Sequence, residues 1–213
     1  MIELLIPSLF ETVYMVFFAT LFSLVIGFPL GIILVISESN GIWEKPLLNK
    51  ILNGIINILR SFPFIILMIL VFPISRLIVG KTIGTTATIV PLSIAAAPFV
   101  ARIIESSLKE VDKGVIELSL SMGATVPQII FKVLIPEAMP SLILGITLTI
   151  INLIGYSAMA GAIGGGGLGN LAIRYGLYRF QTDVMIASVL IIILLVQGIQ
   201  YIGNKLSTSI SKK

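Results

Sequence analysis

The chain has 213 residues, of which 57% are hydrophobic and 11% are charged. Soluble domains carry about 25% charged residues, so this composition excludes an ordinary soluble domain and indicates a protein that lies in a lipid bilayer. The net charge of +4 comes from cations beside hydrophobic runs rather than from a basic stripe interleaved with aromatic residues, and we expect no nucleic-acid binding.

The apolar runs of the chain predict five membrane-spanning helices. Each run is close to the length of about 20 residues that crosses the hydrocarbon core of a bilayer. In chain order the predicted spans cover residues 12–36, 51–72, 83–100, 138–162 and 184–202. The sequence therefore predicts an all-α membrane protein with about five transmembrane helices, in one domain over residues 8–202.

Five prolines lie in or beside the predicted spans. Proline removes a helical hydrogen bond and kinks the axis, and the freed carbonyls must find partners in neighbouring helices or in a water-filled cavity. The resulting bends either only shape the packing or belong to a moving gate. These residues are Pro29, Pro63, Pro73, Pro91 and Pro98.

The distribution of cations predicts the orientation in the membrane, because cytoplasmic loops are enriched in Lys and Arg. An extracytoplasmic N-terminus and a cytoplasmic C-terminus place ten cations inside and four outside, whereas the reverse orientation inverts this ratio. We therefore expect a multi-pass membrane protein with its N-terminus outside and its C-terminus in the cytoplasm. The ten are Lys45, Lys50, Arg60, Arg102, Lys109, Lys113, Lys132, Lys205, Lys212 and Lys213; the four are Arg76, Lys81, Arg174 and Arg179.

The segment 103–137, between the third and fourth spans, is too long for a simple connection and too polar to cross a membrane. On a helical wheel its first half shows two opposed apolar stripes. We expect one stripe to pack on this protein's own helices and the other on a second protein; the alternative is a pair of helices lying passively on the inner leaflet. The predicted inner stripe is Val111, Val115, Leu118 and Met122, and the outer stripe is Ile116 and Leu120, flanked by Lys113 and Glu117.

A second short helix is predicted in the same segment. Gly123 ends the first helix, as glycine does at a C-terminal cap, and Thr125 with Gln128 forms a capping box that begins the second. Apolar residues then recur at helical spacing until Pro136. They are Val126, Ile129, Ile130, Val133 and Leu134.

This segment resembles the cytoplasmic coupling loop of binding-protein-dependent ABC importers, whose pattern is Glu-Ala-Ala, three residues, Gly, nine residues, Ile, one residue, Leu-Pro. Glu117, Gly123 and Pro136 stand at the matching positions. The resemblance implies that the loop docks on a cytoplasmic ATPase, with Glu117 in a charged contact and Gly123 at the turn between the helices. The chain departs from the pattern at Leu118, Ser119, Val133 and Ile135.

Three further stretches look like the methionine ABC transporter permease family: residues 60–67, 89–102 and 155–169. The likeness covers about residues 7–202 and implies the type I importer fold, a permease that is not itself an enzyme, and a substrate that is methionine, another amino acid or a small polar solute. It also implies a location in a bacterial inner membrane, a homodimer, two copies of a separate cytoplasmic ATPase and an extracytoplasmic methionine-binding protein.

Spans three and four contain the few polar residues that are available to line a pathway, although each is equally suited to an ordinary hydrogen bond between helices. Met159 differs, because a flexible thioether beside small residues can close a narrow apolar pore against its symmetry mate. The candidate pathway residues are Ser93, Asn152, Tyr156, Ser157 and Met159, together with Thr147 and Thr149.

The glycine-rich stretch 162–169 is not expected to bind a nucleotide. Neither a Gly-Lys-Ser/Thr sequence after it nor a strand before it is predicted. We expect either a flexible turn or a close approach between helix backbones.

Ionisable groups are nearly absent from the middle of the predicted spans, and the sequence contains no Cys or His. We therefore expect no catalytic residue, cofactor or metal site. A proton-coupled transporter or a charge-selective channel normally keeps such groups at mid-membrane, so both alternatives are weakened. A membrane scaffold or insertase component remains a third possibility.

Overall fold

The computed structural model describes residues 1–211, and within that range every regular element is a helix. The elements follow one another as α1 (Ile2–Ile36), α2 (Pro46–Ser61), α3 (Phe64–Val79), α4 (Thr85–Lys109), α5 (Lys113–Ser121), α6 (Val126–Ile129), η1 (Ile130–Leu134), α7 (Ile135–Glu137), α8 (Met139–Gly161), α9 (Gly167–Leu171), η2 (Ala172–Leu177) and α10 (Thr182–Ser211). The labels η1 and η2 denote π-helices.

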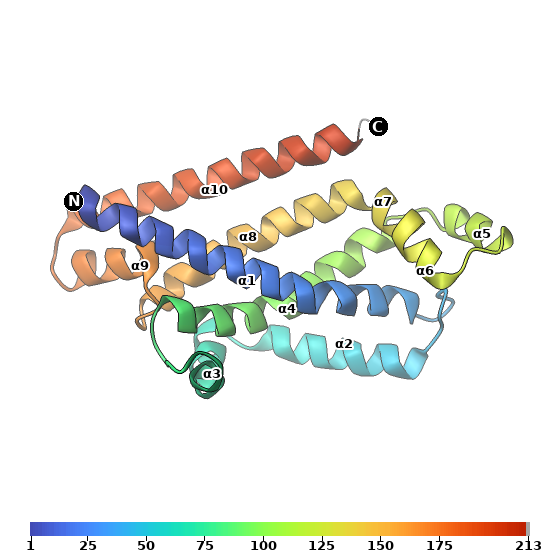
Figure 1. Ribbon diagram of the computed structural model, residues 1–213, viewed down its shortest axis with the longest axis horizontal. Helices are drawn as coiled ribbons and strands as arrows, with labels where there is room; N and C mark the ends of the chain where they lie inside the picture. Colours follow the sequence, from blue (N-terminus) through green and yellow to red (C-terminus); the bar gives the residue numbers. More distant parts are fainter. Residues whose placement is uncertain (212–213) are drawn as a thin grey trace.

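The long helices run along one axis of an elongated bundle (Figure 1). Four of them, α1, α4, α8 and α10, are long and apolar enough to cross a membrane, which confirms four of the predicted spans. The short helices α5, α6 and α7 gather at one end of the bundle, which we name the coupling end. The C-terminal end of α10 points to the coupling end, whereas the N-terminus lies at the opposite end (Figure 1).

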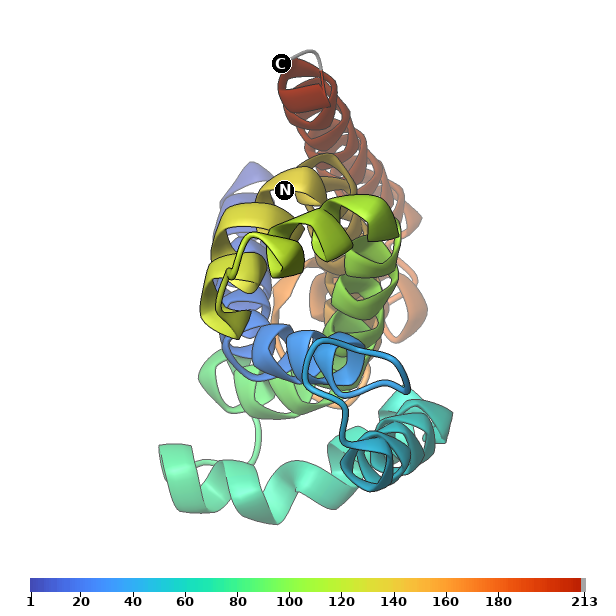
Figure 2. The same cartoon turned by 90° about the vertical axis from the view of Figure 1, so that its right-hand side faces the viewer.

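The prediction of one continuous second span over residues 51–72 is wrong. The chain instead forms α2 and α3, which are long and apolar enough to cross a membrane only when taken together, and which are bent by 106° at the break between them. Phe62 and Pro63 are extended at this break, because proline disfavours the helical conformation in the residue before it. In consequence α3 lies across the bundle rather than along it (Figure 2).

The bend also changes the position of Arg60. It lies in the last turn of α2, 14 residues after Pro46, and is thus about 21 Å along the helix axis from the coupling end. Arg60 therefore does not lie at the same end as segment 103–137, with which the prediction groups it. The orientation itself stays a prediction, and Lys212 and Lys213 lie outside the described residues.

Close packing between α1 and α4 forms the centre of the bundle. Gly27 and Gly31 lie four residues apart on one face of α1, and a Cβ at either would stand 2.6 Å from an atom of α4. On α4 the facing positions include Ala97 and Ala101. Small residues at this spacing let two membrane helices approach until their backbones are in contact.

A buried hydroxyl on α1 provides a test of the packing in the bundle. Thr20 Oγ1 is buried and has no hydrogen-bond partner within residues 1–211. Leaving such a group unpaired costs about 1–3 kcal/mol, whereas a methyl group of the same shape costs little. We expect Thr20→Val to stabilise the protein by about 1 kcal/mol, which a thermal unfolding measurement in detergent would show as a higher Tm. An unchanged or lower Tm would mean that the hydroxyl has a partner in the assembled protein.

Candidate coupling and pathway surfaces

The first helix at the coupling end, α5, has defined caps at both ends. Asp112 is its N-cap, and Asp112 Oδ1 accepts a hydrogen bond from the Gly114 N–H at 2.6 Å. At the other end the Ala124 N–H donates to the Ser119 carbonyl and the Gly123 N–H to that of Leu120, which is a Schellman arrangement. Gly123 has φ +79°, which confirms that glycine ends this helix.

The predicted inner stripe of α5 is wrong, and of the two residues in the predicted outer stripe only Leu120 is exposed, at 45%. Of the expected inner stripe, only Val111 is buried, whereas Leu118 is 62% and Met122 80% exposed. Val115 is also exposed. Ile116, which was expected to face outward, packs against the protein's own core instead. The physical reason is that Val111 precedes the N-cap and is not part of the helix, so its burial says nothing about which face of α5 turns inward.

The inner face of α5 borders a cavity of about 550 Å³. The opposite wall is the turn that follows α1, over residues 38–42, and Leu134 lies between them. Four predicted coupling residues, Lys113, Ile116, Glu117 and Leu120, line this cavity together. They are therefore brought together by the structure, but on the side of α5 that faces the permease.

The second helix of the segment has the predicted form. The Gln128 side chain accepts a hydrogen bond from the Thr125 N–H at 2.8 Å, which confirms the capping box. Ile129, Ile130 and Leu134 are buried in one cluster with the end of α1 and with α4. The helix widens to a π-helix immediately before Pro136, where a proline in an α-helix would crowd the carbonyl four residues earlier.

A network of charged and polar side chains joins α4 to the turn after α1 and to α2. Arg102 Nη1 lies 2.6 Å from Glu105, and Lys109 Nζ lies 3.0 Å from both Glu105 and Glu38. Arg102 Nη2 also donates to Asn57 on α2 at 2.8 Å. Since Glu105 is buried and bridges two cations, this network holds the turn after α1 and the middle of α2 against α4.

The polar face of α2 was missed by the sequence analysis. Asn49 donates to the Leu34 carbonyl at 2.7 Å and to Ser37 at 3.1 Å, and Asn53 donates to Asn49. The signal was present in the sequence, since asparagines recur every four residues at 49, 53 and 57. Such spacing places all three on one side of a helix.

The glycine at the end of α5 allows a prediction. Gly123→Ala forces an L-residue into the left-handed region, at a cost of about 1–2 kcal/mol. We expect faster amide hydrogen exchange in the last turn of α5 and a lower Tm. Gly54→Ala is the matched control, because a Cβ there meets nothing within 4 Å and its φ is ordinary. Equal effects of the two variants would contradict this role of Gly123.

One face of α8 is exposed along its whole length. Asn152 and Met159 both lie on this face, which we name the pathway face, and a Cβ on Gly155 would meet open space. The spacing of three or four residues is that of a single helical stripe. Its members are Leu144, Leu148, Asn152, Gly155 and Met159.

The other candidate pathway residues lie elsewhere. Ser93 and Ser157 are buried, and their hydroxyls donate at 2.7 Å to the carbonyls of Ile89 and Ile154. The rings of Tyr156 and Phe64 are stacked with centroids 4.5 Å apart, at the point where α3 begins. The structure therefore brings together Asn152 and Met159 but not the two serines.

The glycine-rich segment, Ala162–Gly169, is tightly packed. A Cβ on Gly161 would overlap the backbone of Asn170, and one on Gly169 would overlap that of Ala158. The Asn170 side chain also donates to the Gly161 carbonyl at 2.9 Å. The expectation of a close backbone approach is thus confirmed, and the glycines serve contact between the end of α8 and α9.

Comparisons with known proteins agree with this arrangement. Residues 27–205 match the family of binding-protein-dependent transport system inner membrane components. A probable D-methionine transport system permease protein of Vibrio cholerae is 50% identical over 204 residues, which are 96% of this chain and 91% of that protein. A methionine import system permease protein of Bacillus subtilis is 46% identical, over 85% of this chain and 82% of its own length.

A solved structure has the same fold. It is an inward-facing conformation of the MetNI methionine ABC transporter, with a TM-score of 0.97, 43% sequence identity and coverage of 99% of this chain and 97% of the solved one. The predicted all-α fold of a type I importer permease is therefore confirmed. The chain belongs to the family of inner membrane components of binding-protein-dependent transport systems.

Proposed function

We propose that the chain is the permease subunit of an ATP-driven importer for methionine and that a separate cytoplasmic subunit hydrolyses the ATP. The family membership supports a role as permease. The relatives that carry methionine transport in their names are up to 52% identical over nearly the whole chain, and this supports the choice of methionine.

The observation that carries the proposal is the exposed stripe of α5. Val115, Leu118 and Met122 form an exposed apolar surface at the coupling end, with exposed fractions of 39%, 62% and 80%. Exposed apolar patches at the end of a membrane bundle indicate an interface with another protein. We therefore assign the ATPase contact to this stripe, and note that Phe131 in η1 of the same segment is also exposed.

The predicted residues Lys113, Glu117 and Leu120 contribute at the margin of this interface. Ile116 supports it from the inner side, where it holds α5 on the core. Gly123 sets the turn between the two helices of the segment, and Pro136 lies near its C-terminal end. The segment then acts as one rigid body when the ATPase moves.

The pathway face supports a homodimer. A single bundle leaves the stripe from Leu144 to Met159 uncovered, and this stripe includes the polar side chain of Asn152. A two-fold axis beside α8 brings two such faces together, and encloses a route between them. The extracytoplasmic partner is a methionine-binding protein that docks at the N-terminal end of the bundle.

The proposed orientation follows from the position of the coupling end. An ATPase in the cytoplasm requires α5 to be cytoplasmic, and the C-terminal end of α10 lies on the same side (Figure 1). The N-terminus then faces outward. Labelling of single cysteines introduced into the naturally cysteine-free chain measures this orientation directly, and modification of a cysteine near residue 118 by an impermeant reagent in intact cells would contradict it.

Uptake of labelled methionine into vesicles tests the proposed function. We expect uptake only when the chain, its ATPase, the binding protein and ATP are all present. Uptake by the chain alone would indicate a secondary transporter or channel. Absence of flux for methionine with flux of another amino acid would overturn the substrate, and no flux of any solute would favour a scaffold or insertase component.

Met159 tests the pathway face. Met159→Ala removes a long thioether from the exposed stripe next to Ala158 and Ala160, and we expect greater ATP-independent leakage with a change of about threefold or more, because the narrowest part of an apolar pore widens. Ser157→Ala is the control, since that hydroxyl is buried and bonded within α8. Unchanged leakage and transport in Met159→Ala would remove the gate assignment.

A further inference from the structure

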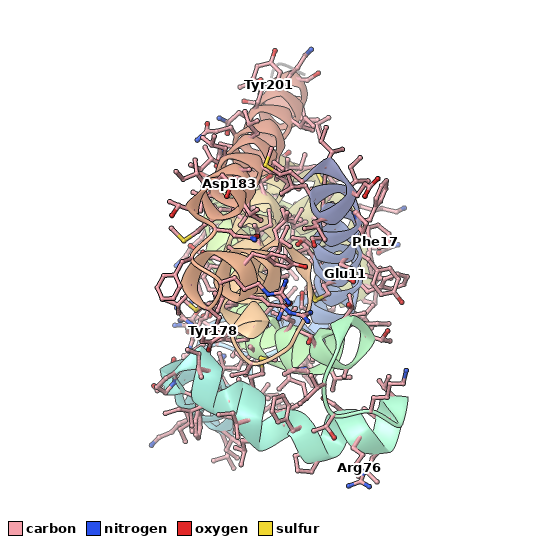
Figure 3. All side chains as sticks on the ribbon, turned by 90° about the vertical axis from the view of Figure 1, so that its left-hand side faces the viewer. Glu11, Phe17, Arg76, Tyr178, Asp183 and Tyr201 are labelled. Atoms are coloured by element: carbon pink, nitrogen blue, oxygen red, sulfur yellow. The ribbon has the colours of Figure 1, made fainter. Side chains whose placement is uncertain are left out.

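Two side chains of α1 are fastened to the glycine-rich segment at the N-terminal end of the bundle. Glu11 Oε2 accepts a hydrogen bond from the Gly167 N–H at 2.7 Å, and Thr12 Oγ1 accepts one from the Leu168 N–H at 2.9 Å. Thr12 is buried and its hydroxyl also donates to the Ser8 carbonyl. Figure 3 looks onto this end, with Glu11 labelled on α1.

The contact between α1 and the glycine-rich segment is tightly packed. A Cβ on Gly167 would stand 2.6 Å from Thr12 Oγ1, and one on Gly166 would stand 2.7 Å from Thr85 Oγ1 on α4. Thr88 on the same helix donates to the Gly165 carbonyl at 3.4 Å. The segment is thus held by α1 and α4 on one side and by the end of α8 on the other.

The other end of α1 reaches the coupling end. Ile36 is buried in one cluster with Ile129 and Leu134, and Glu38 beyond it is paired with Lys109. The helix is continuous over 35 residues, or about 52 Å. Gly31 and its neighbour Gly27 press it against α4 between the two ends.

We propose that Glu11 and Thr12 are positioning residues for transport, which fasten the outer end of the pathway face to α1 and so make it follow the displacement of the coupling segment. The inference rests on the proposed function. Met159 lies one turn before the glycine-rich segment, so a shift of α9 with α1 moves the end of α8 that carries this side chain.

The test uses the complete complex with its ATPase and binding protein. We compare Glu11→Ala, Thr12→Val and the double variant with the control Glu3→Ala, an exposed carboxylate in the first turn of the same helix. We expect assembly and basal ATP hydrolysis to be unchanged in all of them. Methionine transported per ATP should fall about tenfold in the double variant, as expected for the loss of a hydrogen bond to a charged group, and not in the control.

A conservative variant of Glu11 distinguishes the loss of a positioning contact from a general defect in folding or assembly. Glu11→Gln keeps an oxygen acceptor at the same reach and is expected to restore most of the coupling ratio. Equal transport per ATP in wild type and double variant would overturn the inference while leaving the importer function intact. If the wild-type complex itself shows no ATP-dependent methionine uptake, the proposed function fails instead.

A distance measurement covers the case in which the variants assemble poorly. Spin labels at Phe10 and Tyr178, both strongly exposed, report the separation of α1 from the end of η2 in otherwise native protein. We expect the same distance in nucleotide-free and ATP-trapped complexes. A change between the two states would show that α1 and this end move separately, and would overturn the proposal.

Discussion

Leu118→Asp should abolish co-purification of the permease with its ATPase while leaving the fold of the permease unchanged. The side chain is 62% exposed and lies in the middle of the outward stripe of α5. Burial of a leucine in an interface contributes about 2 kcal/mol, and burial of an unpaired carboxylate costs several kcal/mol more. A total above about 3 kcal/mol corresponds to a Kd that rises by more than about 100-fold.

The control for this experiment is Leu177→Asp. Leu177 is similarly exposed but lies in η2, at the opposite end of the bundle, so its substitution should leave the affinity for the ATPase unchanged. Affinity is measured by titration of fluorescent ATPase onto the permease in nanodiscs. If Leu118→Asp binds normally and Leu120→Asp does not, the ATPase contacts the face of α5 that borders the cavity, and our assignment of the stripes in the complex is wrong.

Gly31→Leu should cause a large loss of stability through the contact between α1 and α4. A Cβ at this position would lie 2.6 Å from Ile104 Cβ and 2.7 Å from the Ala101 carbonyl oxygen. The Ala101 carbonyl belongs to the backbone of α4, so it cannot relieve the overlap by changing rotamer as the end of a side chain can. Overpacking of this kind costs about 3 kcal/mol. The Tm measured in detergent should fall by about 6–12 °C, at about 2–4 °C per kcal/mol for a chain of this size.

The matched control is Gly198→Ala in α10. A Cβ there meets nothing within 4 Å, so the substitution adds no contact and removes the flexibility of glycine from a helix interior. Such a change stabilises a helix by about 0.5–1 kcal/mol. A fall in Tm for Gly198→Ala as large as that for Gly31→Leu would show that the method detects insertion defects rather than packing between α1 and α4.

The spans could be predicted from the sequence because hydropathy and length determine which segments cross a bilayer. The fourth prediction, residues 138–162, differs from α8 by one residue at each end. The prediction of span two failed because hydropathy averaged along the chain does not report a change in the direction of the helix axis. The run 51–72 is apolar enough as a whole, but the backbone conformation at Phe62 divides it into α2 and α3.

The candidate sites were predicted less well than the fold. The wheel revealed both stripes of α5, but periodicity alone does not say which stripe faces the core, and Val111 was wrongly counted as helical. Glu11 and Thr12 were not singled out because their partners at Gly167 and Leu168 are 156 residues away in the chain. Contacts of that separation leave no local pattern.

The sharp break at Phe62 and Pro63 has a consequence for the stability of the protein inside a membrane. Proline supplies no N–H, and the last carbonyls of α2 lose their helical donors where the chain turns. Hydrocarbon offers these oxygens no replacement, so a lone protomer surrounded by lipid tails carries an energetic penalty at this corner. Water or a polar group must therefore reach these carbonyls for the corner to be stable inside a membrane.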